Sequence, residues 1–161
     1  TFSPLILSYT TRPLRADDDS RISITKEEFQ KLIDNNELVE WATTHGFLYG
    51  KKKSEINNQL SIGKNIIIES DVKGLDAYRK QFPNLCAIFI KYKNLEDLKD
   101  RLKIAHPEIT NQEIDTRYNT ALKEMQEIEN YNYTIETDPT DTTGNNTTLK
   151  VEEIIRKVLA N

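Results

Sequence analysis

Two arginines near the start of this chain are spaced so that both could bind one phosphate group. Arg12 and Arg15 lie three residues apart around a proline, in the segment SYTTRPLR at residues 8–15. Two guanidinium groups at this spacing can direct their planar forks at one phosphate, a geometry that favours arginine over lysine. For an isolated pair, the commoner alternative is two solvated arginines beside the acidic residues 17–19, so the motif needs support from other segments.

Two carboxylates in later segments could accept hydrogen bonds from a ligand that is rich in donors. Glu40 precedes the only tryptophan, and Asp71 follows the apolar run at residues 65–69. A carboxylate only accepts hydrogen bonds, so it can bind the N1–H and amino groups of guanine but is poorly matched to the acceptor nitrogen of adenine. The alternative is a structural cap at the end of a strand, and it applies to Glu69 as well.

Four segments, taken in order and spacing, resemble the GMP-binding half of guanylate kinases: SYTTRPLR (8–15), VEWA (39–42), LYG (48–50) and ESDVKG (69–74). The resemblance runs from about residue 8 to residue 133. It implies that residues 1–161 form a guanylate kinase-like domain, with a GMP-binding region at about 9–72 and a lid at about 104–118. The implied activity is transfer of the terminal phosphoryl group of ATP to GMP, with these two nucleotides as partners.

The resemblance gives six residues a role in binding GMP. Those expected at the phosphate are Arg12, Arg15 and Tyr49. Those expected at the guanine base are Ser8, Glu40 and Asp71. Taken alone, the Tyr-Gly pair that contains Tyr49 is only a turn signal, so its role depends on the resemblance.

Several positions depart from the family pattern. Arg21 stands where the family has a second phosphate-binding tyrosine, and an arginine can serve the same phosphate. Lys51 lies beside the expected GMP site where relatives have serine or threonine. Ala105 falls where a lid arginine is expected, so the GMP side is better preserved than the ATP side.

Two further arginines match family positions that flank the lid and approach the phosphates of ATP. Arg101 and Arg117 would stabilise the charge on the transferring phosphoryl group; for each alone, a helix-surface salt bridge is the commoner role. The implied Mg²⁺ arrives with ATP. No metal site built by the protein is expected, because neither His45 nor His106 lies at ligand spacing from cysteine or clustered carboxylates.

The 161-residue sequence contains no segment with the phosphate-loop pattern G-x-x-x-x-G-K-[ST]. We therefore interpret the chain as a guanylate kinase without its opening strand, phosphate loop and first helix, and expect the chain as given to be inactive alone. The alternative is a non-catalytic guanylate kinase-like module that binds a phosphorylated peptide. Glu40 and Asp71 favour the enzyme, because a phosphopeptide gives them nothing to recognise.

The composition narrows the remaining possibilities. A net charge of −4 and a pI near 5.3 argue against nucleic-acid and anionic-membrane partners. The single cysteine, Cys86, allows no intrachain disulfide, and no leader or membrane-length apolar run is present, so we expect a cytoplasmic protein. The sequence leaves the oligomeric state open, and a homo-oligomer is one alternative.

Hydrophobic periodicity predicts an α/β fold with a parallel sheet flanked by helices, and the resemblance specifies the P-loop nucleoside monophosphate kinase type, with a small GMP-binding subdomain and a helical lid. Strands are expected at residues 5–8, 38–42, 65–69, 85–90 and 131–135. Helices are expected at residues 26–35, 54–60, 74–82, 95–104, 110–128 and 151–159. Residues 65–69 and 85–90, joined by a helix, predict a β-α-β crossover, and residues 137–148 are expected to form a loop.

Overall fold

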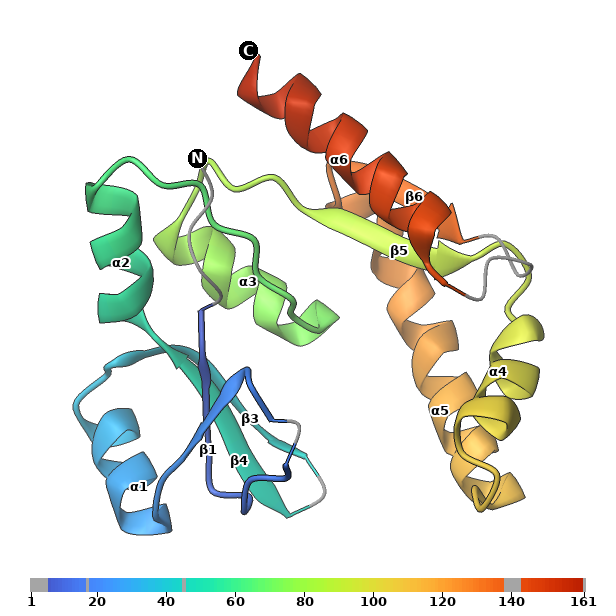
Figure 1. The fold of residues 1–161 in the computed structure, drawn as a ribbon, viewed down its shortest axis with the longest axis horizontal. Coiled ribbons are helices and arrows are strands. Elements are labelled where there is room, and N and C mark those ends of the chain that lie inside the picture. Colours follow the sequence, from blue (N-terminus) through green and yellow to red (C-terminus); the bar gives the residue numbers. More distant parts are fainter. Residues whose placement is uncertain (1–5, 17, 45, 138–142, 161) are drawn as a thin grey trace. The chain divides into compact units, whose positions relative to one another are not determined.

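The computed structural model describes residues 6–16, 18–44, 46–137 and 143–160 (Figure 1). They form two compact units, Thr1–Leu85 and Cys86–Asn161. The elements of the first unit are β1 (Ser8–Thr10), β2 (Arg21–Ser23), α1 (Lys26–Asp34), β3 (Leu38–Thr44), β4 (Phe47–Lys52), α2 (Lys53–Ser61) and α3 (Val72–Gln81).

The first unit contains a four-stranded sheet in the order β2-β1-β4-β3. β1 and β2 are parallel, and this pairing places Ser8 opposite Arg21. The other two pairs are antiparallel, and the β3–β4 pair places Glu40 opposite Lys51. β3 confirms the strand expected at residues 38–42, whereas β2 and β4 were not predicted. The register therefore brings together residues that are far apart in sequence.

Helix α1 begins where the sequence predicts. The Thr25 hydroxyl accepts a hydrogen bond from the Glu28 N–H at 3.1 Å, and the Glu28 carboxylate accepts one from the Thr25 N–H at 2.8 Å. This reciprocal capping box satisfies two backbone donors that a helix start leaves free. Phe29 and Leu32 lie on the buried face and pack with Leu38 of β3. Local capping and apolar spacing together fix this helix against the sheet.

The predicted strand at residues 65–69 is not formed. Only Asn65 makes a ladder bridge, and the residues that follow it have no strand pairing. Ile66 and Ile68 still pack against the core, while Ile67 is 59% exposed, so the side chains alternate as in an extended chain. β-branched residues favour extension and burial, but a strand also needs a neighbouring backbone to pair with. The expected β-α-β crossover from this segment is therefore wrong for the described residues.

The strand expected at residues 5–8 also differs from the structure. Residue 5 lies outside the described part, and β1 starts only at Ser8. Ile6 is instead a core residue, packed in a cluster with Val39 and Ile56. The apolar residue Ile6 is therefore buried without belonging to a strand. The strand hydrogen bonds are made by the polar residues Ser8–Thr10.

The second unit contains β5 (Ile88–Tyr92), α4 (Asp97–Ala105), α5 (Asn111–Glu124), the 3₁₀ helix η1 (Met125–Asn130), β6 (Tyr133–Thr137) and α6 (Asn145–Leu159). β5 and β6 pair in parallel, with Ile88 opposite Tyr133. The Asn132 side chain accepts a hydrogen bond from the Ala87 N–H at 2.8 Å, which secures the start of this pair. The strands expected at residues 85–90 and 131–135 are confirmed within a few residues.

The helices of the second unit differ from the predictions mainly at their ends. The predicted helix at 110–128 starts with the expected capping box of Thr110 and Glu113, but it changes to 3₁₀ geometry after residue 124. Helix α6 begins at Asn145, six residues before the predicted start and inside the expected loop at 137–148; residues 138–142 of that loop lie outside the described part. Its first turn is polar, so the apolar pattern could not mark it.

Candidate functional site

One cleft of the first unit, with a volume of about 510 Å³, contains six of the eight predicted substrate-binding residues. They are Ser8, Arg21, Glu40, Tyr49, Lys51 and Asp71. The strand register accounts for most of this grouping, because β1 pairs with β2 and β3 pairs with β4. The segment at residues 67–71, which leads into α3, supplies further lining residues. The cleft thus combines acceptors, cations and hydroxyl groups.

Glu40 is half-buried at this cleft and has several polar neighbours. Both carboxylate oxygens lie 3.3 Å from the Ser70 hydroxyl, which can donate to either. Burial raises the pKa of the Glu40 carboxyl, and the charge of Lys51 opposes that rise. The approach to α3 is so close that a Cβ atom added at Gly74 would fall 1.8 Å from Oε2 of Glu40. Glycine at position 74 leaves the space that this carboxylate occupies.

Tyr78 contributes a buried hydroxyl near Glu40, a feature that the sequence analysis missed. The residue is 5% exposed, and its hydroxyl makes no hydrogen bond of good geometry to any described residue. Burial, followed by the charge of Glu40, raises the pKa of Tyr78. The sequence could have indicated it, because Tyr78 places a polar hydroxyl group on the apolar face of the helix predicted at residues 74–82.

Asp71 caps helix α3 and also lines the cleft. Its Oδ1 accepts a hydrogen bond from the Gly74 N–H at 2.8 Å. Asp71 therefore has a structural role as the cap of a helix, whereas the alternative considered from the sequence was a cap at the end of a strand. A carboxylate has about four acceptor positions in total, so capping leaves capacity for donors that enter the cleft. The two roles are compatible.

The arginine pair of the first motif does not belong to the residues that line the cleft. Arg12 Nη2 lies 2.5 Å from Oδ2 of Asp18, and Arg21 Nη1 lies 2.7 Å from Oδ1. The Arg15 N–H donates to Oδ2 of the same carboxylate at 2.7 Å, while the Arg15 side chain is exposed. The hydrogen bond from the Arg15 N–H and the two guanidinium groups lower the pKa of Asp18 to about 2. The sequence analysis missed Asp18, which was visible only as part of an acidic turn.

Tyr49 and Lys51 lie on β4, where alternate residues share one face. Tyr49 pairs with Ala42 of β3, and its hydroxyl is one of the groups that raise the pKa of Arg12, after the larger effect of Asp18. Lys51 Nζ donates to the backbone carbonyl of Glu69 at 3.2 Å. This contact links β4 to the segment before α3 and holds a positive charge at the cleft.

The two predicted catalytic arginines belong to the second unit. Arg101 on α4 is half-buried, and its guanidinium lies 5.7 Å from the centre of the Tyr92 ring, a cation–π distance. Arg117 on α5 is exposed. The predicted lid at 104–118 comprises the end of α4, a connection, and the first half of α5, where Ile114 is buried.

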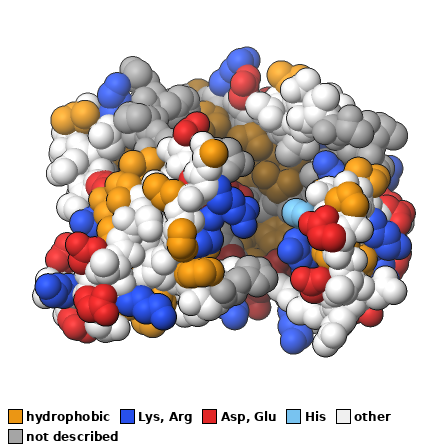
Figure 2. All heavy atoms as spheres, turned by 60° about the horizontal axis from the view of Figure 1, so that its bottom comes forward, with side chains coloured by type: hydrophobic (Ala, Val, Ile, Leu, Met, Phe, Trp, Pro, Cys, Tyr) orange, Lys and Arg blue, Asp and Glu red, His pale blue; other side chains and the backbone are white. Residues whose placement is uncertain are grey.

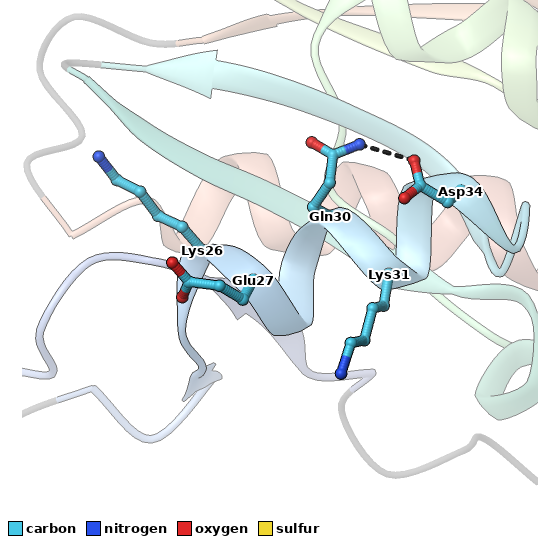
Figure 3. Close-up of a pocket in the computed structure, with 5 residues that line it drawn as sticks. All are labelled: Lys26, Glu27, Gln30, Lys31 and Asp34. Atoms are coloured by element: carbon cyan, nitrogen blue, oxygen red, sulfur yellow. Dashed lines mark hydrogen bonds between the residues drawn. The ribbon is translucent and has the colours of Figure 1, made fainter.

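A second hollow, of about 470 Å³, lies over the solvent face of α1 and is lined by Lys26, Glu27, Gln30, Lys31 and Asp34 (Figure 3). Its side chains come from one helix, and Figure 3 shows them spread along it rather than converging, apart from the hydrogen bond from Gln30 to Asp34 at 2.8 Å. Charges of both signs offset one another there. This hollow has no arrangement that selects a ligand.

Acidic and basic side chains are intermixed on the face drawn in Figure 2. Within the described part of the chain, every helix is too short or too polar to pass through a bilayer. Over the same residues, no group of three or more His, Cys, Asp and Glu side chains is arranged to hold a metal ion.

The sequence of this chain is similar to those of known proteins from several bacteria. The guanylate kinase from Helicobacter pylori (strain ATCC 700392 / 26695) is 36% identical over 132 residues, which cover 80% of this chain and 64% of the relative. The guanylate kinase from Caldanaerobacter subterraneus subsp. tengcongensis is 31% identical over 140 residues, which cover 85% of this chain and 68% of the relative. The chain thus spans slightly less than two thirds of the length of the Helicobacter relative.

A solved structure agrees at the level of the fold. The crystal structure of guanylate kinase from Anaplasma phagocytophilum superposes with a TM-score of 0.74 at 22% sequence identity, covering 96% of this chain and 74% of that one. This neighbour confirms the predicted α/β fold class of the P-loop kinase type. The family model for guanylate kinase matches residues 1–158. The chain therefore belongs to the guanylate kinase family.

Proposed function

We propose that the cleft of the first unit binds GMP, and that the protein transfers the terminal phosphoryl group of ATP to GMP, giving GDP and ADP. The observation that carries this proposal is the grouping of Glu40 and Asp71 with Arg21 and Lys51 in one cleft. Two acceptors suit a donor-rich base, and two cations suit a phosphate. The names of the relatives described above support the same activity.

Glu40 and Asp71 would select guanine. Guanine presents N1–H and an exocyclic amino group as donors, whereas adenine presents an acceptor nitrogen at position 1. Glu40 is held by the Ser70 hydroxyl and by close packing at Gly74, so its carboxylate is positioned before the base arrives. Ser8 at the same cleft adds a hydroxyl that can donate or accept.

The phosphate of GMP would lie beside the cationic and hydroxyl groups. Arg21, Tyr49 and Lys51 line the cleft, and Arg12 joins Arg21 through their shared partner Asp18. Arg15 has an exposed side chain that can turn towards a phosphate. We assign this set to the acceptor phosphate, within the GMP-binding region at about residues 9–72.

The chemical step needs no protein nucleophile. A phosphate oxygen of GMP forms a bond to the terminal phosphorus of ATP, and the bond from that phosphorus to the bridging oxygen breaks, leaving ADP. Arg101 and Arg117 would offset the charge that develops on the transferring group. Mg²⁺ would enter bound to the phosphate oxygens of ATP. Lid residues 104–118 would exclude water during transfer.

Calorimetric titration of the chain with GMP, AMP and guanosine tests the acceptor site. We expect GMP to bind with a clear preference over AMP, and guanosine to bind more weakly because it lacks the phosphate. A phosphotyrosine or phosphoserine peptide is the fourth ligand. If a folded sample binds the peptide but not GMP, the proposed enzyme function is wrong and the phosphopeptide-binding module is favoured.

A further inference from the structure

Asp18 holds together the cations that the proposed function assigns to the substrate phosphate. Each of its carboxylate oxygens contacts a different arginine, Arg12 at 2.5 Å and Arg21 at 2.7 Å. The Arg15 N–H adds a third donor. The Asp18 side chain is 5% exposed and that of Arg12 is 14% exposed, so this ion pair is largely shielded from water. Two guanidinium groups and a backbone N–H around one anion also form a phosphate-binding arrangement.

Both terminal nitrogens of Arg12 donate hydrogen bonds to acceptors in its own loop. Its Nη2 donates to Asp18, and its Nη1 donates to the backbone carbonyl of Pro13 at 3.1 Å. Both terminal nitrogens therefore already have an acceptor. Arg21, the other partner of Asp18, lines the cleft, whereas Arg12 does not.

We propose that Asp18 is a positioning residue that occupies the arginine cluster when no substrate is bound and must release Arg12 for the phosphate of GMP to engage it. This inference rests on the proposed function, because the competing anion is the substrate phosphate. Asp18 lowers the affinity for that phosphate, and its ion pairs also keep Arg12 and Arg21 ordered. It thereby sets how strongly the site favours a doubly charged phosphate over weaker anions.

The charges explain why Asp18 competes rather than assists. Arg12, Arg21 and Asp18 together carry a net charge of +1, and asparagine at position 18 would raise it to +2. A phosphate bound by both arginines would also lie close to a carboxylate of like charge, which is unfavourable in a partly shielded site. Asparagine keeps an oxygen that can accept from the Arg15 N–H, so the loop retains one of its three contacts.

The test compares Asp18→Asn with Asp19→Asn, a matched change at the exposed neighbouring position. Both variants and the unchanged chain are titrated with GMP, guanosine and inorganic phosphate at one ionic strength. We expect Asp18→Asn to bind GMP and phosphate about 3- to 10-fold more tightly, because the substitution removes a nearby negative charge that repels the phosphate. Guanosine affinity should not change, and Asp19→Asn should stay within about twofold for every ligand because exposed charges are screened.

Equal or weaker binding of GMP and phosphate by Asp18→Asn, relative to Asp19→Asn, overturns the proposal. A purely structural role would weaken binding and could not tighten it. If the unchanged chain shows no preference for GMP over AMP, the proposed function fails, and the inorganic phosphate titration still decides the role of Asp18. If Asp18→Asn binds inorganic phosphate no more tightly than the unchanged chain, the proposal is contradicted.

A second measurement needs no substitution and covers the case in which Asp18→Asn does not fold. The ¹³C resonance of the Asp18 carboxylate is followed in the unchanged chain during titration with GMP and with inorganic phosphate. Release of the carboxylate predicts a saturable shift towards the position of a solvated aspartate. A resonance that stays fixed while the ligand saturates the protein shows that the ion pair persists, and this contradicts the proposal.

Discussion

Glu40 shows how one residue acquires a role from its surroundings. The carboxylate is half-buried and lies beside a serine hydroxyl and a tyrosine hydroxyl, and burial raises its pKa. A partly dehydrated acceptor binds donors more strongly than one in water, but it is also costly to leave unpaired. These properties suit a group that reads the donor edge of a base.

Replacing Glu40 with glutamine is expected to weaken GMP binding by about 1–3 kcal/mol, because one of two acceptor oxygens becomes a donor that faces the donors of guanine. Calorimetry with GMP and guanosine measures the change, and both ligands should be affected. Glu69→Gln is the matched control, since Glu69 lines the same cleft with an exposed side chain. An unchanged affinity for Glu40→Gln would remove this residue from the base site.

The Asp18 cluster makes a separate prediction about stability and pH. Asp18 has a pKa of about 2 in the folded chain against an ordinary value of 3.8, because the Arg15 N–H and two arginines favour its ionised form. A carboxyl whose pKa is lowered on folding stabilises the folded state above its unfolded pKa, and this contribution is lost as the pH falls through the folded value. The unchanged chain should therefore lose stability, relative to Asp18→Asn, between about pH 4 and pH 2.

Urea unfolding at a series of pH values measures this difference. The midpoint of the unchanged chain should exceed that of Asp18→Asn near neutral pH, and the gap should narrow as the pH approaches about 3. The Asp19→Asn variant should show no comparable narrowing. A gap that stays constant with pH would mean that the ion pair with Arg12 and Arg21 does not stabilise the fold.

At the scale of elements, the start of helix α3 determines the shape of the cleft wall. Asp71 caps the helix, Ser70 precedes it, and Gly74 in its first turn leaves room for the Glu40 carboxylate. Three residues of one short segment thus position a side chain that comes from β3. The helix contributes through backbone proximity as well as through side chains.

Gly74→Ala is expected to weaken GMP binding by about 1–3 kcal/mol, because its methyl group would overlap the position of Glu40 Oε2 and force that side chain away from the cleft. Alanine favours a helix more than glycine does, so the helix itself should persist. Calorimetry measures the affinity and circular dichroism the helix content. Lys73→Ala, at the exposed preceding position, is the control. Normal GMP affinity in Gly74→Ala would show that Glu40 can move without consequence.

Elements with local signals were predicted well. The capping boxes of α1 and α5 depend on residues three apart, and both form at the predicted positions. Residues 65–69 also have a strong local signal, a run of β-branched residues, yet within this segment only Asn65 makes a β-bridge. The difference is physical, because a helix satisfies its own hydrogen bonds whereas a strand depends on a partner that a local pattern does not specify.

At the scale of the whole molecule, the two units carry different parts of the proposed chemistry. The cleft with its acceptors and cations belongs to the first unit, and Arg101 and Arg117 belong to the second. This division separates binding of the acceptor nucleotide from stabilisation of the transferring group. It also allows the two functions to be tested by different measurements.

Arg117→Ala is expected to leave GMP affinity within about twofold and to lower kcat for phosphoryl transfer from ATP to GMP by about 10²–10³, the usual cost of removing one donor to a developing charge. Calorimetry measures the affinity and steady-state kinetics measures kcat. Lys123→Ala, on the exposed face of the same helix, is the control. A loss of GMP affinity without a change in kcat would assign Arg117 to substrate binding.

The sequence alone indicated the α/β class and the starts of α1 and α5, because hydrophobic periodicity and capping boxes depend on short spacings. It indicated the family through the resemblance of four segments. It did not indicate that β2 and β4 would complete a mixed sheet, nor that Tyr78 would lie buried near Glu40. It also did not indicate that Asp18 joins Arg12 to Arg21. Only tertiary structure decided these points, since strand register and burial arise from contacts between distant segments and determine which charges meet and which are shielded from water.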